Sequence, residues 1–148
     1  MRQALRLAEE APADDVPVGA VIVLEEAIVG RGVNRREADR DPTAHAEIVA
    51  LRDAARRLGR WRLDGATLYV TVEPCPMCAG AIWMARISRV VYGVPEPKTG
   101  AVHSVMELLA HPRLGRHVPA VGGCLEEECR QLLQRFFATH RAERCESG

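Results

Sequence analysis

The sequence predicts an α/β fold in which a mixed β-sheet is covered by helices on both faces. Apolar runs of strand length alternate along the chain with stretches of helical length, which is typical of a sheet between helical layers. Only Glu25-Glu26 separates the first two apolar runs, so we expect an antiparallel hairpin there. The later strands are joined through helices and should be parallel. With 148 residues, 47% of them hydrophobic, the chain can bury a core without disulfides.

The individual elements follow from periodicity and from start and stop signals. Asp41-Pro42-Thr43 begins a helix and Gly59 ends it, because Asp or Thr can cap a helix, proline suits its first turn and glycine suits its end. The expected strands are 18–24, 27–33, 66–72, 89–94 and 118–121. The expected helices are 1–10, 44–58, 77–86, 102–110 and 125–144. We expect one domain over residues 1–143 and a disordered tail over 144–148.

The helix expected at 77–86 is apolar on nearly all sides. Such a helix must be covered by more than the sheet, and a second copy of the chain is a candidate for the other cover.

Charge and composition limit the functional classes. The formal net charge is zero, with 20 basic and 20 acidic residues, which argues against a purely electrostatic nucleic-acid binder. We expect no membrane span and no secretory leader, since no apolar run approaches the ~20 residues of a membrane helix and the N-terminus is charged and amphipathic. The expected location is the cytoplasm, where the five cysteines should be thiols or metal ligands.

Two short clusters carry the candidate chemistry, and each follows a helix-start signal: His45-Ala46-Glu47 and Pro74-Cys75-Pro76-Met77-Cys78. A helix N-terminus favours thiolate, and two cysteines three apart can grip one metal ion. With His45 as third ligand, a zinc ion keeps an open fourth position, which is typical of a catalytic site. Glu47 is offset from His45 and suits proton transfer rather than ligation.

Other readings of these residues exist. A C-x-x-C pair can be a redox centre or half of a structural zinc site. The upstream His-x-Glu on a second capped helix argues against the redox reading, and the lack of a well-placed fourth ligand argues against structural zinc. The other histidines and cysteines show no zinc-ligand spacing and are expected to be solvated or packed: His103, His111, His117, His140, Cys124, Cys129 and Cys145.

The pattern H-x-E followed by P-C-x-x-C is the signature of zinc nucleobase deaminases. These zinc motifs alone would fit the whole cytidine-deaminase superfamily. The longer runs 41–48, 66–81, 86–93 and 98–100 are more specific, and over nearly the whole chain the sequence resembles the bacterial tRNA-specific adenosine deaminases. This resemblance implies a three-layer αβα sandwich with a five-stranded mixed sheet, cytidine deaminase-like, and a homodimer. It also implies conversion of adenosine to inosine at the wobble position of an arginine tRNA anticodon stem-loop, with one Zn²⁺ per chain on His45, Cys75 and Cys78 and with Glu47 as catalytic proton carrier.

The resemblance also implies substrate-binding residues. Asn34 matches the family's nucleoside-contacting asparagine, although its spacing alone favours a turn residue. Ala46 lies between the metal ligand and the proton carrier, and Lys98 lies in a loop that meets RNA. Phe136 and Phe137 match an aromatic pair near the substrate entrance, although by pattern alone they would be core residues. The arginines of the last helix could meet phosphates or form a solvated face.

The chain departs from the family where the substrate is chosen. Glu96 stands where the family usually has an aspartate, and His103-Ser104 replaces a common Gly-Ser. The alternative function is therefore a deaminase of a free nucleobase or nucleoside, of guanine or cytosine type. A non-catalytic zinc subunit that only binds RNA would have no need of Glu47.

Overall fold

The computed structural model describes residues 1–147. The strands of this range are β1 (Gly19–Leu24), β2 (Ala27–Val33), β3 (Thr67–Val72), β4 (Arg89–Val94) and β5 (Ala120–Val121). They form one five-stranded sheet in the order β2-β1-β3-β4-β5. The helices are α1 (Arg2–Glu9), α2 (Ala46–Leu58), α3 (Pro76–Met84) and α4 (Glu126–Glu146), with a 3₁₀ turn at Leu108–Ala110.

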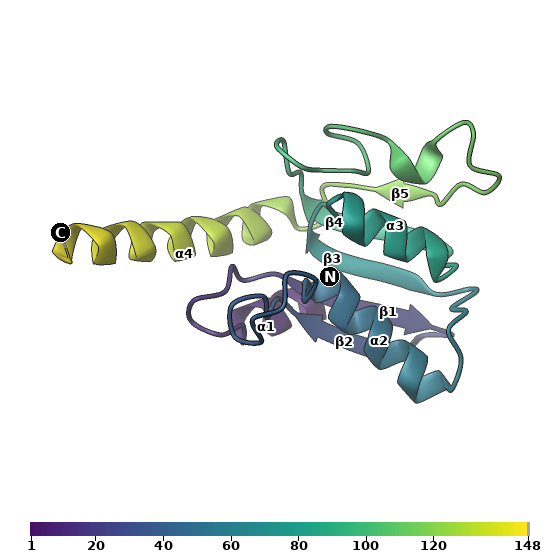
Figure 1. Ribbon diagram of the computed structural model, residues 1–148, viewed down its shortest axis with the longest axis horizontal. Coiled ribbons are helices and arrows are strands. Elements are labelled where there is room, and N and C mark those ends of the chain that lie inside the picture. The colour runs from purple at the N-terminus through teal and green to yellow at the C-terminus, as the bar shows by residue number, and fades with distance from the viewer. Residues whose placement is uncertain (148) are drawn as a thin grey trace.

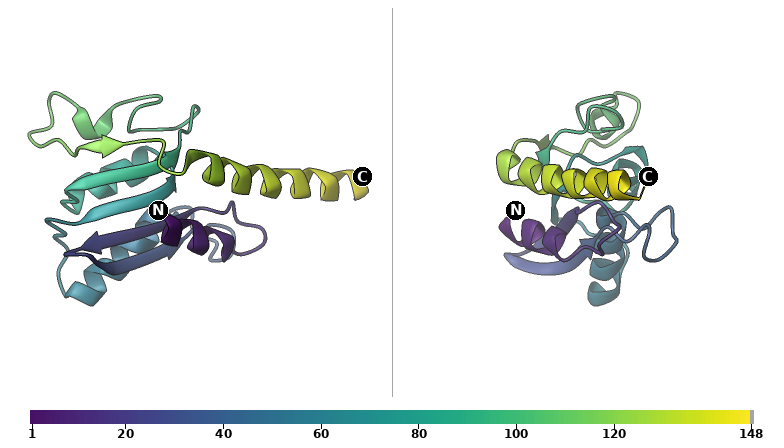
Figure 2. Two further views of the ribbon diagram at one scale, coloured as in Figure 1. Left: turned by 180° about the vertical axis from the view of Figure 1, so that it is seen from behind. Right: turned by 90° about the vertical axis from the view of Figure 1, so that its left-hand side faces the viewer.

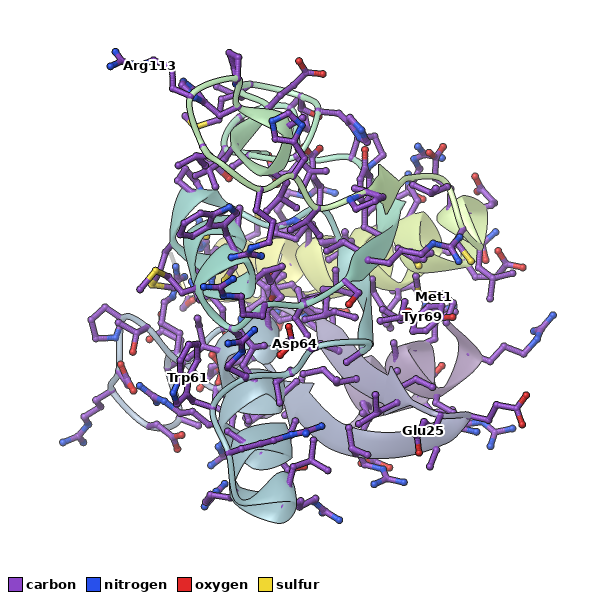
Figure 3. The ribbon with its side chains drawn as sticks, turned by 90° about the vertical axis from the view of Figure 1, so that its right-hand side faces the viewer. Met1, Glu25, Trp61, Asp64, Tyr69 and Arg113 are labelled. Atoms are coloured by element: carbon purple, nitrogen blue, oxygen red, sulfur yellow. The ribbon has the colours of Figure 1, made fainter. Side chains whose placement is uncertain are left out.

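The sheet lies between two helical layers. Helices α2 and α3 cover one face, while α1 and the first part of α4 lie behind the other face (Figures 1 and 2). Viewed from the side, Trp61 lies on the α2 and α3 side of the sheet, whereas Tyr69 and Met1 lie on the α1 side (Figure 3). The α/β class and the three-layer sandwich with a mixed sheet are therefore confirmed.

Strand direction decides which loops become neighbours. β1 pairs antiparallel with both β2 and β3, whereas β4 pairs parallel with β3 and with β5. Because β3 and β4 run in the same direction, their C-terminal ends lie at the same end of the sheet, and the chain leaves both strands there. The segment after β3 begins α3, and the segment after β4 is a long loop, so the two lie side by side there.

The position of α2 depends on small residues beneath it. Gly30 and Gly32 of β2 face the helix, and a Cβ atom on Gly32 would lie 2.5 Å from the backbone nitrogen of Ala50. The buried alanines Ala46, Ala50 and Ala54 meet these glycines from the helix side. This absence of side-chain bulk lets α2 lie directly on the strand.

Two expectations differ from the structure. Residues 102–110 do not form the expected α-helix and contain only the 3₁₀ turn at Leu108–Ala110, because the backbone N–H groups of Val102, His103 and Ser104 donate to the carboxylate of Glu73 instead of to helical carbonyls. Residues 144–146 are helical, since α4 continues to Glu146 where disorder was predicted. Arginine, alanine and glutamate all extend a helix, and nothing before residue 147 stops it. Residue 148 lies outside the described range.

Across residues 1–147 the helices are all too short or too polar to cross a membrane. Beyond the sheet, α4 projects away from the body of the protein (Figures 1 and 2).

Candidate metal and deaminase site

Two helix starts bring three ligands together. His45 is the N-cap residue of α2 and Cys75 is the N-cap residue of α3, with Cys78 one turn further along α3. The Nδ1 atom of His45 lies 3.6 Å from the Sγ atom of Cys75 and 3.5 Å from that of Cys78. The three ligand atoms all lie within 4.8 Å of one another. Sequence spacing had predicted this grouping.

The geometry and chemistry of these donors fit zinc. Tetrahedral bonds of about 2.0–2.3 Å place nitrogen and sulfur ligands roughly 3.5–3.8 Å apart, close to the distances from His45 to the two sulfur atoms. One imidazole and two thiolates form a donor set that zinc prefers, and three protein ligands leave a fourth position. A zinc ion held in this way would lower the pKa of a water molecule and make it a better nucleophile for hydrolysis.

One of the two thiols, that of Cys75, is already ionised toward the form that binds metal, whereas the hydrogen bond with Cys75 and burial raise the pKa of Cys78. Hydrogen bonding from Cys78, together with the His45 contact, lowers the pKa of Cys75 to about 4 against the cost of burial. The hydrogen bond between Cys75 and His45 raises the pKa of the His45 imidazole. Cys75 is therefore a thiolate at neutral pH, which is the state that ligates a metal.

Glu47 lies beside this cluster in the first turn of α2. Its side chain is only 4% exposed, and burial raises the pKa of its carboxyl group to about 7. A carboxyl group with a pKa near neutrality can both accept and release a proton under ordinary conditions. Its place and its acidity suit the proton-carrying role that the sequence suggested.

A cavity of about 240 Å³ opens onto these residues. His45, Glu47 and Cys75 line it together with four of the predicted substrate residues: Asn34, Ala46, Glu96 and Phe137. Sites for drug-sized ligands occupy about 300–1,000 Å³, so this cavity has the scale of a single nucleobase. Lys98 is not among the described residues that line it.

The predicted substrate residues differ in how free their side chains are. Asn34 is 8% exposed; its Nδ2 atom donates to the carbonyl of Val16 at 3.1 Å and its Oδ1 atom accepts from the amide of Arg36 at 3.3 Å. Its amide group therefore braces the turn after β2, as its spacing alone had suggested, while facing the cavity. Ala46 is fully buried and contributes the start of α2 to the wall.

The two aromatic residues of α4, Phe136 and Phe137, occupy different positions relative to the cavity. Phe137 is 46% exposed and reaches the cavity, which contradicts the pattern-based expectation of a core residue for it. Phe136 is half-buried; its ring meets Phe137 edge to face, with centroids 5.3 Å apart, and lies 4.0 Å from the ring of His140. Phe136 thus supports the residue that faces the cavity.

Glu96 and Lys98 belong to one turn of the loop after β4. The Oε1 atom of Glu96 accepts a hydrogen bond from the backbone amide of Lys98 at 3.0 Å. Glu96 lines the cavity, whereas Lys98 is exposed. The glutamate thus faces the cavity and the lysine faces the solvent outside it.

Three charged residues near the site were not predicted from sequence. Arg36 lines the cavity, and the buried carboxylates Asp15 and Glu73 each accept backbone hydrogen bonds from a loop that borders it. A sequence signal for Glu73 did exist, because a charged residue stands between an apolar strand and Pro74.

Comparison with known proteins places these features in a family. Residues 1–94 match the cytidine and deoxycytidylate deaminase zinc-binding region. The chain is 43% identical to a tRNA-specific adenosine deaminase of Bacillus subtilis, over 97% of this chain and 90% of that protein. It is 47% identical to one of Agrobacterium fabrum, over 88% of this chain and 86% of that protein.

Solved structures agree with this assignment. A tRNA:A34 deaminase, from work on A-to-I editing at the wobble position of transfer RNA, superposes with a TM-score of 0.85 at 44% identity, over 89% of this chain and 96% of that one. A guanine deaminase of Bacillus subtilis superposes less closely, with a TM-score of 0.60 at 36% identity, over 80% of this chain and 79% of that one. The chain therefore belongs to the zinc-binding cytidine and deoxycytidylate deaminase family and, within it, to the tRNA-specific adenosine deaminases.

Proposed function

We propose that this enzyme deaminates adenosine to inosine at the wobble position of an arginine tRNA anticodon loop. One observation carries the proposal. A His-Cys-Cys ligand set suited to zinc and the buried carboxyl group of Glu47 lie together at one cavity of the size of a nucleobase. The named relatives, which are tRNA-specific adenosine deaminases, support adenosine in tRNA as the substrate.

The proposed reaction consumes one water molecule and releases one ammonia. The water oxygen forms a bond to C6 of the adenine, the bond from C6 to the exocyclic nitrogen breaks, and inosine remains. Glu47 takes a proton from the water and passes it to the purine ring, then takes the remaining proton from the new C6 hydroxyl group and delivers it to the departing nitrogen, which leaves as ammonia. The target base must leave the stack to enter the cavity, which costs least in a single-stranded loop.

The wall residues have separate proposed roles. Asn34 and the buried start of α2 at Ala46 define one side of the base pocket. Phe137 offers an exposed ring at the mouth, where a base can stack. Glu96 takes the place of the family's aspartate in contacting the sugar, and Lys98 faces the phosphate backbone outside the cavity.

The direct test uses zinc-loaded protein and an arginine-tRNA anticodon stem-loop with adenosine at the wobble position. Mass analysis after nuclease digestion should find inosine at that position and nowhere else. Glu47→Gln should retain one zinc per chain and bind the same RNA, yet lose turnover by roughly 100-fold or more. An active Glu47→Gln enzyme would contradict the proposed proton route.

The same assay distinguishes the tRNA deaminase from the second candidate, a deaminase of a free base or nucleoside. Similarity to a solved guanine deaminase favours a free base as the alternative substrate. Ammonia released rapidly from guanine, cytidine or free adenosine, with no inosine in RNA, would establish a free-base deaminase instead.

We also propose that the enzyme is a homodimer joined through α2 and α3. An apolar hollow of about 540 Å³ lies between them, and its rim carries Trp61 and Met84, which are 62% and 64% exposed. Exposed apolar surface of this kind is typical of an interaction site. Light scattering should give twice the chain mass for the natural protein, and Met84→Asp should reduce it to one chain mass; a monomeric natural protein would disprove the proposal.

A further inference from the structure

Glu73 is a buried carboxylate that does not belong to the metal cluster. Its side chain is only 3% exposed. It stands after β3 and two residues before Cys75. The cavity wall includes it. A buried charge persists only if hydrogen bonds replace the water that it has lost.

Those hydrogen bonds all come from the loop after β4, here called the rim loop (residues 95–104). The Oε2 atom accepts from the backbone amides of Val102, His103 and Ser104 at 3.1, 2.8 and 2.9 Å. The Oε1 atom accepts from the amide of Glu96 at 3.1 Å and from the hydroxyl group of Ser104. Both ends of the rim loop are thus tied to one side chain.

A further feature shows that the loop is built around this carboxylate. A Cβ atom on Gly100 would lie 2.5 Å from either carboxylate oxygen, so only glycine lets the loop close over Glu73. Glu73 is therefore enclosed by the rim loop, whose donors engage both of its carboxylate oxygens.

The rim loop also supplies part of the pocket wall. Glu96 and Thr99 from this loop line the cavity, as do Asn34 and Ala46 from other segments. The amide of Glu96 is itself one of the donors to Glu73. The buried carboxylate therefore fixes the position of a cavity-lining residue through that residue's backbone.

We propose that Glu73 is a positioning residue that holds the rim loop in place and thereby sets recognition of the substrate nucleotide rather than the chemical step. This inference rests on the proposed function for its substrate but not for its structural content. Glu73 acts through Glu96 and Thr99, whereas the proton transfers belong to Glu47.

The substitution Glu73→Gln tests this link selectively. A glutamine keeps one oxygen acceptor and replaces the other with a donating NH₂ group. The oxygen should stay toward the three amides of residues 102–104, because the opposite orientation would set three donors against NH₂. The NH₂ group then faces the Glu96 amide, while the Ser104 hydroxyl can turn to accept. The bond to Glu96 is thus the one that is lost.

The first readout does not involve substrate. Hydrogen–deuterium exchange of the zinc-loaded protein should show faster exchange in Glu73→Gln over residues 95–99, with zinc content unchanged at one per chain. Unchanged exchange in the rim loop would overturn the inference, whatever the enzyme's substrate is.

The second readout is the split between KM and kcat on the anticodon stem-loop RNA. Losing a hydrogen bond to a charged group should raise KM about tenfold while kcat falls less than threefold. A fall in kcat at constant KM, or a loss of zinc, would overturn the positioning role. If the natural enzyme itself makes no inosine, the proposed function fails while the exchange experiment still decides the role of Glu73.

A matched control separates positioning from general destabilisation. Thr71 of β3 is 1% exposed, and its hydroxyl oxygen accepts from the amide of Gly19 in β1 at 3.2 Å, a donor that does not belong to the rim loop. Thr71→Val removes this buried hydrogen bond with little change of shape. It should lower the urea midpoint without altering KM or rim-loop exchange; an equal rise in KM would overturn the inference.

Discussion

Replacing Gly32 by alanine should displace the start of α2 and damage activity more than folding. Gly32 lies in β2 directly beneath the helix that carries His45 and Glu47. The added Cβ atom would lie 2.5 Å from the backbone nitrogen of Ala50 and closer still to the carbonyl oxygen of Ala46. These are backbone atoms of α2 and cannot turn aside as a flexible side chain would.

The size of the effect follows from the overlap between the added Cβ atom and the backbone of α2. Ordinary van der Waals contact lies roughly 1 Å further out, so α2 must lift from the sheet by about that distance. Overpacking of this kind costs about 1–3 kcal/mol, a part of the ~5–15 kcal/mol that stabilises a typical domain. A catalytic group misplaced by about 1 Å can cost roughly 100-fold in rate. Both His45 and Glu47 move with the helix.

Three measurements on Gly32→Ala check this reasoning: the urea unfolding midpoint, the zinc content and kcat/KM for inosine formation. Gly115→Ala is the control, because no atom lies within 4 Å of a Cβ atom built there. The control should match the natural enzyme in all three measurements or gain slightly in stability. If Gly32→Ala kept natural stability and activity, the close packing of α2 on β2 would not control the site.

Three other perturbations have defined outcomes. A zinc chelator should abolish turnover, and added zinc should restore it to the natural enzyme but not to Cys75→Ser, as metal analysis and activity will report. Glu73 has an unfolded pKa near 4.5 and a folded value of about 2, so its contribution to stability is complete above pH 4.5 and is lost as the pH falls toward 2. Urea titrations at pH 3 and pH 6 should therefore show a smaller pH effect in Glu73→Gln, and an equal effect in both proteins would refute this. Arg116 donates to the carbonyl of Trp83 at 2.6 Å and places its guanidinium group 4.7 Å from the Trp83 ring centre. Arg116→Met should cost about 1–2 kcal/mol in unfolding free energy without changing kcat, and an unchanged midpoint would count against this contact.

The sequence predicted most of the framework because its signals are local. Apolar runs rich in branched residues located every strand, and Asp41-Pro42-Thr43 and Pro74-Cys75-Pro76 marked the helix starts that hold the ligands. The metal cluster was predictable for the same reason, since its members lie at fixed offsets from those starts.

The failures share a different cause. Residues 102–110 have helical periodicity, yet their amides bind a carboxylate about 30 positions earlier in the chain. No local pattern reveals that partner, because the parallel pairing of β3 and β4 brings it into reach. By pattern alone Phe137 would also be a core residue, whereas the family resemblance places it near the substrate entrance, in keeping with its exposed ring on the cavity.

The parallel exit of β3 and β4 also has a meaning for how such enzymes diversify. In the function proposed here, the reaction depends on residues at two helix starts, while substrate recognition depends in part on a separate stretch of chain that follows the neighbouring strand β4. The two stretches can therefore vary at different rates, and a new rim segment can be exchanged without rebuilding the metal centre. Such a replacement segment must meet two conditions. It must donate backbone N–H groups to the carboxylate of Glu73 after β3, as Val102 and His103 do, and it must place a glycine against that carboxylate, as Gly100 does.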